Sequence, residues 1–123
     1  MSYLKRRSRS FVYALKGVAA LVRTQPNARI HLAATVAVAA LGCWFSLDRL
    51  EWALVIVAVM TVWVAEGINT AIEALADVVS PDRHPLIARA KDVAAAAVLI
   101  AAVGAIFIGF LVFAERLRRL FSG

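Results

Sequence analysis

Uncharged, mostly apolar residues run along this chain in three long blocks, at 32–47, 52–65 and 93–114. Short segments that carry most of the charges separate the blocks. The third block, VAAAAVLIAAVGAIFIGFLVFA, is longer than the roughly 20 apolar residues that a transmembrane helix needs. With their flanking residues, the blocks predict membrane spans over about 28–47, 51–76 and 92–115. The segment 48–51 predicts a tight turn, and the segment 78–92, with Pro81 and Pro85, predicts a water-exposed loop.

The residues before the first block show the spacing of an amphipathic helix. Apolar side chains recur on one helical face, and basic side chains lie elsewhere. The apolar positions are Phe11, Val12, Leu15, Val18, Ala19 and Val22. A helix over about 5–24 with this pattern is suited to the membrane interface. The sequence therefore predicts an all-α membrane protein, in which residues 1–123 form one domain of three transmembrane helices preceded by an amphipathic surface helix.

Composition supports a lipid environment. Hydrophobic residues make up 63% of the 123 residues and charged residues 18%, against roughly 45–50% and 25% in soluble proteins. A soluble domain of this length could not bury so much apolar surface. The single cysteine, Cys43, excludes an intrachain disulfide and any metal site built on cysteine spacing.

The net charge of +6 is concentrated next to the predicted spans. This placement fits anionic lipid headgroups, and we expect no nucleic-acid partner. Ten Lys and Arg residues lie in 1–29 and 78–92, against four in 48–51 and 115–123. The positive-inside rule then places the N-terminus and the 78–92 loop in the cytoplasm, in a multi-pass membrane protein. The basic C-terminal segment, ERLRRL, disagrees with this orientation.

Three carboxylates interrupt the end of the second span, in the stretch AEGINTAIEALAD at 65–77. On a helix that turns 100° per residue, Glu73 and Asp77 each lie within about 20° of Glu66, and Asn69 borders the same stripe. Glu66 lies about 21 Å beyond Trp52, within a hydrocarbon layer of about 30 Å. The stripe thus runs from inside the membrane to the cytosol.

Such a stripe is suited to chemistry between a membrane lipid and a soluble reagent. An ionised Glu66 in the hydrocarbon layer would cost about 2.5–3.5 kcal/mol, so it is a functional candidate. We expect Glu66 to accept a proton from a lipid hydroxyl and Glu73 to hold Mg²⁺ that arrives with ATP. No glycine-rich phosphate loop is present in the sequence. The competing interpretation is that these are interfacial charges of a small non-enzymatic pore or transporter subunit.

Several segments together resemble the prokaryotic diacylglycerol kinase family, which includes undecaprenol kinases. The resemblance lies in FVYALKG at 11–17, NARIHL at 27–32, EGINTAIEALAD at 66–77 and SPDRHPLIARAKDVAAAAVLI at 80–100. It implies a homotrimer of three-span subunits that transfers the γ-phosphoryl group of MgATP to a membrane lipid alcohol. Diacylglycerol, giving phosphatidic acid, is the first candidate substrate, and undecaprenol, giving undecaprenyl phosphate, is the alternative.

The resemblance also assigns roles to individual residues. It implies Glu66 as the catalytic base and Glu73 as a metal ligand. The nucleotide-binding candidates are Arg6, Tyr13, Asn69, Glu73, Asp77, Asp82, His84, Lys91 and Asp92. Where the family commonly has a second metal-binding glutamate, this chain has Gln25, which offers a neutral amide oxygen. Gln25 is therefore a doubtful ligand.

Overall fold

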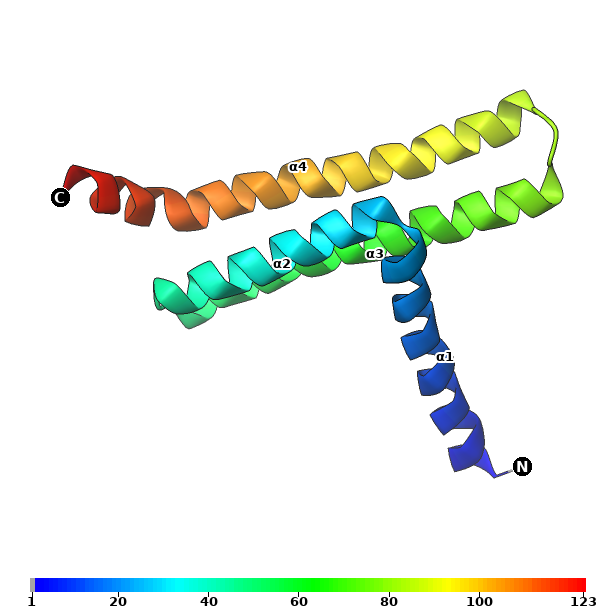
Figure 1. Cartoon of the computed structure of the whole chain (residues 1–123), viewed down its shortest axis with the longest axis horizontal. Coiled ribbons are helices and arrows are strands. Elements are labelled where there is room, and N and C mark those ends of the chain that lie inside the picture. The colour runs from blue at the N-terminus through cyan, green and yellow to red at the C-terminus, as the bar shows by residue number, and fades with distance from the viewer. Residues whose placement is uncertain (1) are drawn as a thin grey trace.

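The structure is a computed structural model that describes residues 2–123, and it is helical almost throughout. Four helices follow one another in these residues: α1 (Tyr3–Thr24), α2 (Pro26–Trp44), α3 (Arg49–Val79) and α4 (Pro85–Ser122). The antiparallel helices α3 and α4 lie side by side, and α2 packs along the first part of α3 (Figure 1). The helix α1 turns away from the other three at the start of α2 (Figure 1).

The helices α3 and α4 are long and apolar enough to cross a membrane. At 1.5 Å per residue, their 31 and 38 residues extend about 46 and 57 Å, well beyond a 30 Å hydrocarbon layer. The helices therefore extend beyond the spans expected at 51–76 and 92–115, because residues at both ends continue the helices. The all-helical class is confirmed, with two candidate spans in the described residues.

The connection between α3 and α4 is much shorter than the expected loop at 78–92. The helix α3 continues to Val79, and α4 begins at Pro85. Proline is compatible with the first turn of a helix, where its missing N–H removes no helical hydrogen bond. His84 precedes it as the N-cap, and its Nδ1 accepts a hydrogen bond from the Leu86 amide at 3.2 Å. Only Ser80–His84 remain as the connection.

The turn between α2 and α3 lies at 45–48 rather than 48–51. Asp48 caps α3 by accepting from the Glu51 amide at 2.9 Å, while the Glu51 side chain accepts from the Asp48 amide at 3.0 Å. This capping box fixes the start of α3. A Cβ on Gly42 would lie 2.6 Å from the Trp52 ring, so glycine is required where the two helices meet.

Packing inside the single chain is sparse. The buried apolar cluster consists of Leu47, Val55, Val112 and Phe113, near the α2–α3 turn. Many large apolar side chains are exposed along the helices, including Ile56, Ile100 and Ile106. Exposed apolar side chains on long helices are suited to lipid or to another copy of the chain.

Candidate functional site

Glu66 lies in the buried stripe of α3. The buried positions of this helix recur every three, four or seven residues and are Val55, Ala58, Val62, Glu66, Asn69 and Ala76. Small and branched apolar side chains fill the first half of the stripe, and a carboxylate takes the next core position. Glu66 is only 1% exposed, so the helix packing holds a charged-type side chain where an apolar one is usual.

The side chain that meets Glu66 is His31 of α2. The distance between His31 Nε2 and Glu66 Oε2 is 3.4 Å, without the alignment of a hydrogen bond. Within residues 2–123, four buried side-chain atoms lack a hydrogen-bond partner: His31 Nε2, Glu66 Oε2, Asn69 Oδ1 and Thr70 Oγ1. Buried polar atoms are normally satisfied, so these four atoms mark the place in the bundle where the packing leaves polar groups unpaired.

His31 was not among the residues predicted for the site. The sequence does contain a signal for it, because a histidine six residues into an otherwise apolar helix is as unusual as the carboxylate that it meets. The missing information was the register of α2 against α3. Only the packed structure shows that His31 faces Glu66.

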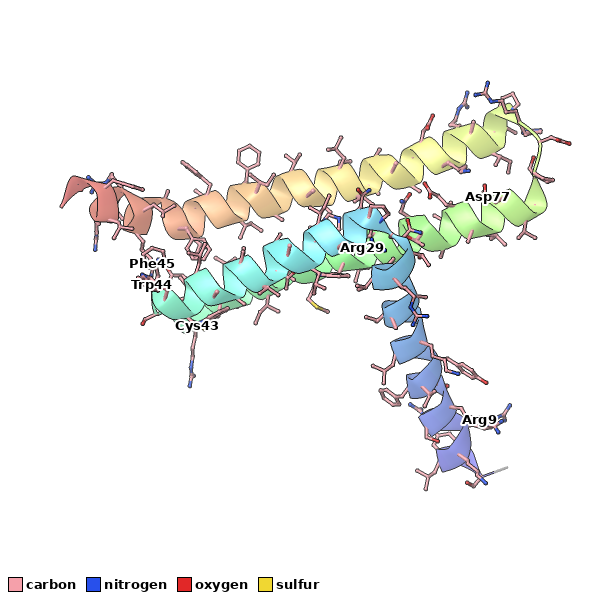
Figure 2. All side chains as sticks on the ribbon, in the orientation of Figure 1. Arg9, Arg29, Cys43, Trp44, Phe45 and Asp77 are labelled. Carbon is pink, nitrogen blue, oxygen red and sulfur yellow. The ribbon has the colours of Figure 1, made fainter. Side chains whose placement is uncertain are left out.

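Glu73, Asp77 and Lys91 lie together nearer the α3–α4 connection. Lys91 Nζ donates to Asp77 Oδ1 at 2.8 Å, and the Asp77 side chain is 70% exposed. The hydrogen bond with Asp77 is the main cause that raises the pKa of Lys91 above 10.5, and the negative charge of Glu73 contributes. The stripe predicted from the sequence therefore exists in space: Glu66 is buried, Glu73 is half-buried and Asp77 is exposed. Figure 2 shows Asp77 toward the connection end of α3.

The metal-binding candidates do not form a complete site within one chain. In the part of the chain that the structure describes, no group of three or more His, Cys, Asp or Glu side chains is placed to hold a metal ion. Glu73 is half-buried on α3, and Gln25 is half-buried at the α1–α2 corner. Gln25 donates its amide N–H to Thr24 Oγ1 at 3.3 Å, which leaves the amide oxygen as the group that could face a cation.

The remaining candidates near the connection are less closely gathered. Asp82 and His84 lie in the exposed connection, where Ser80 Oγ donates to the Asp82 carbonyl at 2.8 Å. Asp92 is exposed and lies about 160° around α4 from Ala94, which is buried. The structure thus brings Lys91 to the α3 stripe but leaves its neighbour Asp92 on another face of α4.

Arg6 and Tyr13 lie on the exposed first half of α1, which runs away from the bundle (Figure 1). Lys16 Nζ lies 5.8 Å from the centroid of the Tyr13 ring. The corner between α1 and α2 is fixed by Arg29, whose guanidinium donates to the Val22 and Arg23 carbonyls at 3.1 and 2.5 Å. These bonds satisfy carbonyls at the end of α1, so the direction of α1 is set at its C-terminal end. One chain does not bring Arg6 and Tyr13 to the carboxylate stripe.

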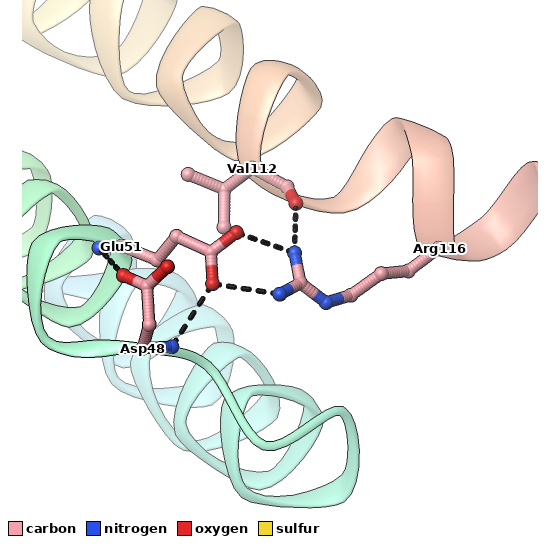
Figure 3. Close-up of polar contacts among 4 residues, drawn as sticks. All are labelled: Asp48, Glu51, Val112 and Arg116. Atoms are coloured by element: carbon pink, nitrogen blue, oxygen red, sulfur yellow. Dashed lines mark hydrogen bonds and ion pairs between the residues drawn. The ribbon is translucent and has the colours of Figure 1, made fainter.

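The opposite end of the bundle holds a different polar cluster. Arg116 of α4 donates to both carboxylate oxygens of Glu51, at 2.5 and 2.7 Å, and to the Val112 carbonyl at 3.0 Å (Figure 3). The capping box with Asp48 adds a further hydrogen bond to Glu51. This bidentate arrangement joins the first turn of α3 to the last part of α4, and it explains one of the basic residues of the C-terminal segment.

Two grooves flank the buried stripe. One of about 1150 Å³ opens between α3 and α4, and Asn69 and Arg89 are among its lining residues. The other, of about 380 Å³, lies between α2, α3 and α4 and is lined by His31, Thr35 and Trp63 among apolar side chains. Asn69 and His31 thus bring polar side chains to the walls of two otherwise largely apolar grooves, a combination that is typical of small-molecule sites.

Comparison with known proteins gives the same family throughout. The family described as prokaryotic diacylglycerol kinase matches residues 12–113. The chain is 38% identical to the undecaprenol kinase of Bacillus subtilis (strain 168) over 114 residues, which cover 93% of each protein. It is 36% identical to the diacylglycerol kinase of Escherichia coli (strain K12) over 94 residues, which cover 76% of this chain and 77% of the relative. It is also 39% identical over 101 residues to a diacylglycerol kinase of Synechocystis, covering 81% of this chain and 58% of that protein. The chain belongs to the prokaryotic diacylglycerol kinase family.

Proposed function

We propose that this lipid kinase transfers the γ-phosphoryl group of ATP to the hydroxyl of a membrane lipid alcohol, with Glu66 as the base. The observation that carries the proposal is the graded exposure of one helical stripe. Glu66 is buried, Glu73 is half-buried, and Asp77 is exposed and bonded to Lys91. A lipid hydroxyl and a soluble nucleotide have to meet across such a boundary. Membership in a kinase family argues against the pore or transporter alternative.

Glu66 is suited to the proton-transfer step because its Oε2 has no hydrogen-bond partner among the described residues. In the proposed step, the lipid hydroxyl gives its proton to the Glu66 carboxylate, and its oxygen forms a bond to the γ-phosphorus. The bond from the γ-phosphorus to the bridging oxygen breaks, and ADP leaves with that oxygen. Phosphoryl transfer depends chiefly on positioning and charge neutralisation. The protein therefore needs to supply only one well-placed base for the proton transfer.

The nucleotide is proposed to bind at the water-facing part of the stripe. Lys91, bonded to Asp77, carries a positive charge for phosphate oxygens. Asn69 lies about two helical turns before Asp77 on α3, in the lining of the α3–α4 groove. The other nucleotide candidates lie on α1, in the connection or on another face of α4, and they are Arg6, Tyr13, Asp82, His84 and Asp92. Because one chain leaves these side chains apart, we propose that neighbouring copies in a homotrimer complete the site.

Mg²⁺ is the proposed cofactor, held by Glu73 and the ATP phosphates, with the Gln25 amide oxygen as a weaker candidate. The fit rests on donor chemistry, since a half-buried carboxylate at the water boundary is the type of ligand that Mg²⁺ prefers. When bound, the ion neutralises negative charge on the phosphates. Replacing Glu73 with alanine is expected to raise the Mg²⁺ concentration needed for half-maximal rate. An unchanged Mg²⁺ dependence would reject the ligand role, and Gln25→Ala is the matched test of the second ligand.

The lipid substrate is the part of the proposal that a direct assay decides. Diacylglycerol, giving phosphatidic acid, is the first candidate. The match to the undecaprenol kinase covers 93% of the chain and keeps undecaprenol as the second candidate. Purified protein in micelles with γ-labelled ATP is offered each alcohol at equal concentration. Labelled lipid in either arm supports the kinase proposal and names the substrate, and no labelled lipid in both arms would overturn it.

We further propose that α2 is a third span, with α1 on the cytoplasmic surface and the N-terminus in the cytoplasm. Two observations support this orientation despite the basic C-terminal segment. Arg116 is bonded to Glu51, and Glu115 accepts from both Arg118 and Arg119. In a Cys43→Ala background, a cysteine at Ser80 should react with an impermeant maleimide only in opened cells, and a cysteine at Ser122 also in intact cells. The reverse labelling pattern would overturn the orientation.

A further inference from the structure

Within residues 2–123, the polar side chain from another helix that lies against the buried carboxylate of Glu66 is His31. Its Nε2 lies 3.4 Å from Glu66 Oε2. The two side chains are 17% and 2% exposed, so water has little access to the contact. Charge interactions at this distance are strong when solvent is excluded.

Trp63 is the aromatic side chain that contacts the imidazole. The two rings meet edge-on, with centroids 6.4 Å apart and planes 67° apart. Trp63 precedes Glu66 by one helical turn, so α3 supplies both the carboxylate and the aromatic support. Thr35 acts on the backbone instead, because its Oγ1 donates to the His31 carbonyl at 2.6 Å and accepts from Trp63 Nε1 at 3.0 Å. The contact with Trp63 therefore orients the imidazole, and Thr35 links α2 to α3.

No other titratable group competes for this contact in the described part of the chain. The α4 side chains that share the groove with His31 are Ala102, Ala105, Ile106, Ile108 and Gly109. The guanidinium of Arg29, two residues before His31 on α2, is committed to the carbonyls at the end of α1. Glu73 lies about two helical turns further toward the connection, and Asp77 with its partner Lys91 about three. His31 is therefore the basic side chain that the packed helices bring to Glu66.

We propose that His31 is a positioning residue for Glu66, which keeps the carboxylate ionised and aimed so that it can accept the proton of the lipid hydroxyl. This inference rests on the proposed function of Glu66. A carboxylate alone in an apolar layer tends to take up a proton, and a protonated acid cannot act as a base. An imidazole can oppose that tendency either as an N–H donor or as a cation.

The alternative is that His31 only joins α2 to α3, as a polar contact between membrane helices. Both interpretations predict some loss of stability when His31 is replaced. They differ in the pH dependence of the reaction, because a structural contact does not change the protonation of Glu66. They also differ in the kinetic constant affected, since the nucleotide site lies further along α3.

The first experiment compares the pH–rate profiles of His31→Leu, His31→Gln and Thr35→Val with that of the unmodified protein. The acid limb of kcat is expected to move to higher pH by about one unit or more in His31→Leu. His31→Gln keeps a hydrogen-bond donor but not the charge, so a smaller shift is expected. The KM for ATP should stay within about twofold, and Thr35→Val should lose thermal stability with no shift of the profile. Unshifted profiles in both His31 variants would leave only the structural role and overturn the proposal.

The second experiment separates this inference from the proposed function, because it needs no activity. The chain contains two histidines, so the imidazole ¹⁵N signals of His31 can be identified in micelles with His84→Gln. The titration midpoint of His31 is expected to fall by about one pH unit or more in Glu66→Gln. An equal midpoint with and without the carboxylate would overturn the coupling, even if Glu66→Gln were inactive. A shifted midpoint with full activity in Glu66→Gln would instead keep the coupling and reject Glu66 as the base.

Discussion

Glu51 and Glu66 are two carboxylates on the same helix, the first in its first turn and the second near its middle, and their surroundings are opposite. Glu51 accepts two bonds from Arg116 and one from the Asp48 amide. Glu66 is more deeply buried, and its Oε2 has no hydrogen-bond partner among the described side chains. The satisfied group joins α3 to α4 at the far end of the bundle. The unsatisfied group lies near the middle of α3 against His31, and it is the carboxylate for which we propose the role of base.

The comparison teaches that burial alone does not distinguish a structural carboxylate from a functional one. Glu51 is partly buried as well, with 21% of its side chain exposed. What differs is whether the protein supplies the partners that a buried charge requires. At Glu51 it does so from two elements, and at Glu66 it supplies one histidine at 3.4 Å.

The largest expected effect comes from Glu66→Gln. Removing a general base lowers kcat by about 10²- to 10⁴-fold, and we expect a loss in that range. Folding and oligomer size should be unchanged, because glutamine is nearly the same size and removes a charge that is expensive to bury. Micelle-based kinase assays and size-exclusion chromatography measure the two properties. Glu51→Gln is the matched control, with kcat expected within about twofold of the unmodified protein. Full activity of Glu66→Gln would reject Glu66 as the base.

A smaller effect on a different constant is expected from Lys91→Ala. The loss of a positive charge at the water-facing end of the stripe should raise the KM for ATP by about tenfold. The KM for the lipid alcohol should be nearly unchanged. Asp77→Asn is the companion variant, because it keeps the size of the partner of Lys91 but removes its charge. An equal change in both KM values would mean that Lys91 does not act on the nucleotide specifically.

The contact between Lys91 and Asp77 also predicts how ATP binding depends on pH. Because Asp77 and Glu73 raise the pKa of Lys91 above 10.5, the lysine remains charged throughout the neutral and mildly alkaline range. The contribution of the pair is fully present below the ordinary lysine pKa and is lost as pH rises through the raised value. ATP binding is therefore expected to be constant from about pH 7 to 9 with respect to this group. Isothermal titration calorimetry with ATP measures this affinity at each pH. A loss of ATP affinity below pH 9 that is absent in Lys91→Arg would contradict the prediction.

The smallest effect on activity, with a clear effect on stability, is expected at the end of the bundle where Arg116 is bonded to Glu51. Arg116→Leu removes the bidentate bonds to Glu51 and leaves the capping box in place. The thermal midpoint should fall by a few degrees, while kcat and both KM values stay within about twofold. Arg118→Leu is the control, since its bond to Glu115 lies within one exposed helical turn. A large loss of activity in Arg116→Leu would show that the contact between Glu51 and Arg116 is not purely structural.

Much of the architecture could be read from the periodicity of the sequence. The apolar blocks identified the helices, but the turn between α2 and α3 lies at 45–48 and not at the expected 48–51. The predicted extent of the 78–92 loop was wrong, because Pro85 and the polar residues after it form the first turns of α4. Proline at the first turn begins a helix as readily as it ends one, and the His84 cap that decides between these outcomes is a local hydrogen bond. Element types were therefore predictable, and element ends were not.

The sequence by itself determined the family, the all-helical class and the spacing of Glu66, Glu73 and Asp77 along one face, because helical geometry converts spacing into direction. The tertiary structure decided which residues from other helices meet that face. It placed His31 against Glu66 and Lys91 against Asp77, and it left Arg6, Tyr13 and Asp92 apart within one chain. The physical reason is that the register between two packed helices depends on how all their side chains fit together. That fit is a property of the folded pair, and no single stretch of sequence contains it.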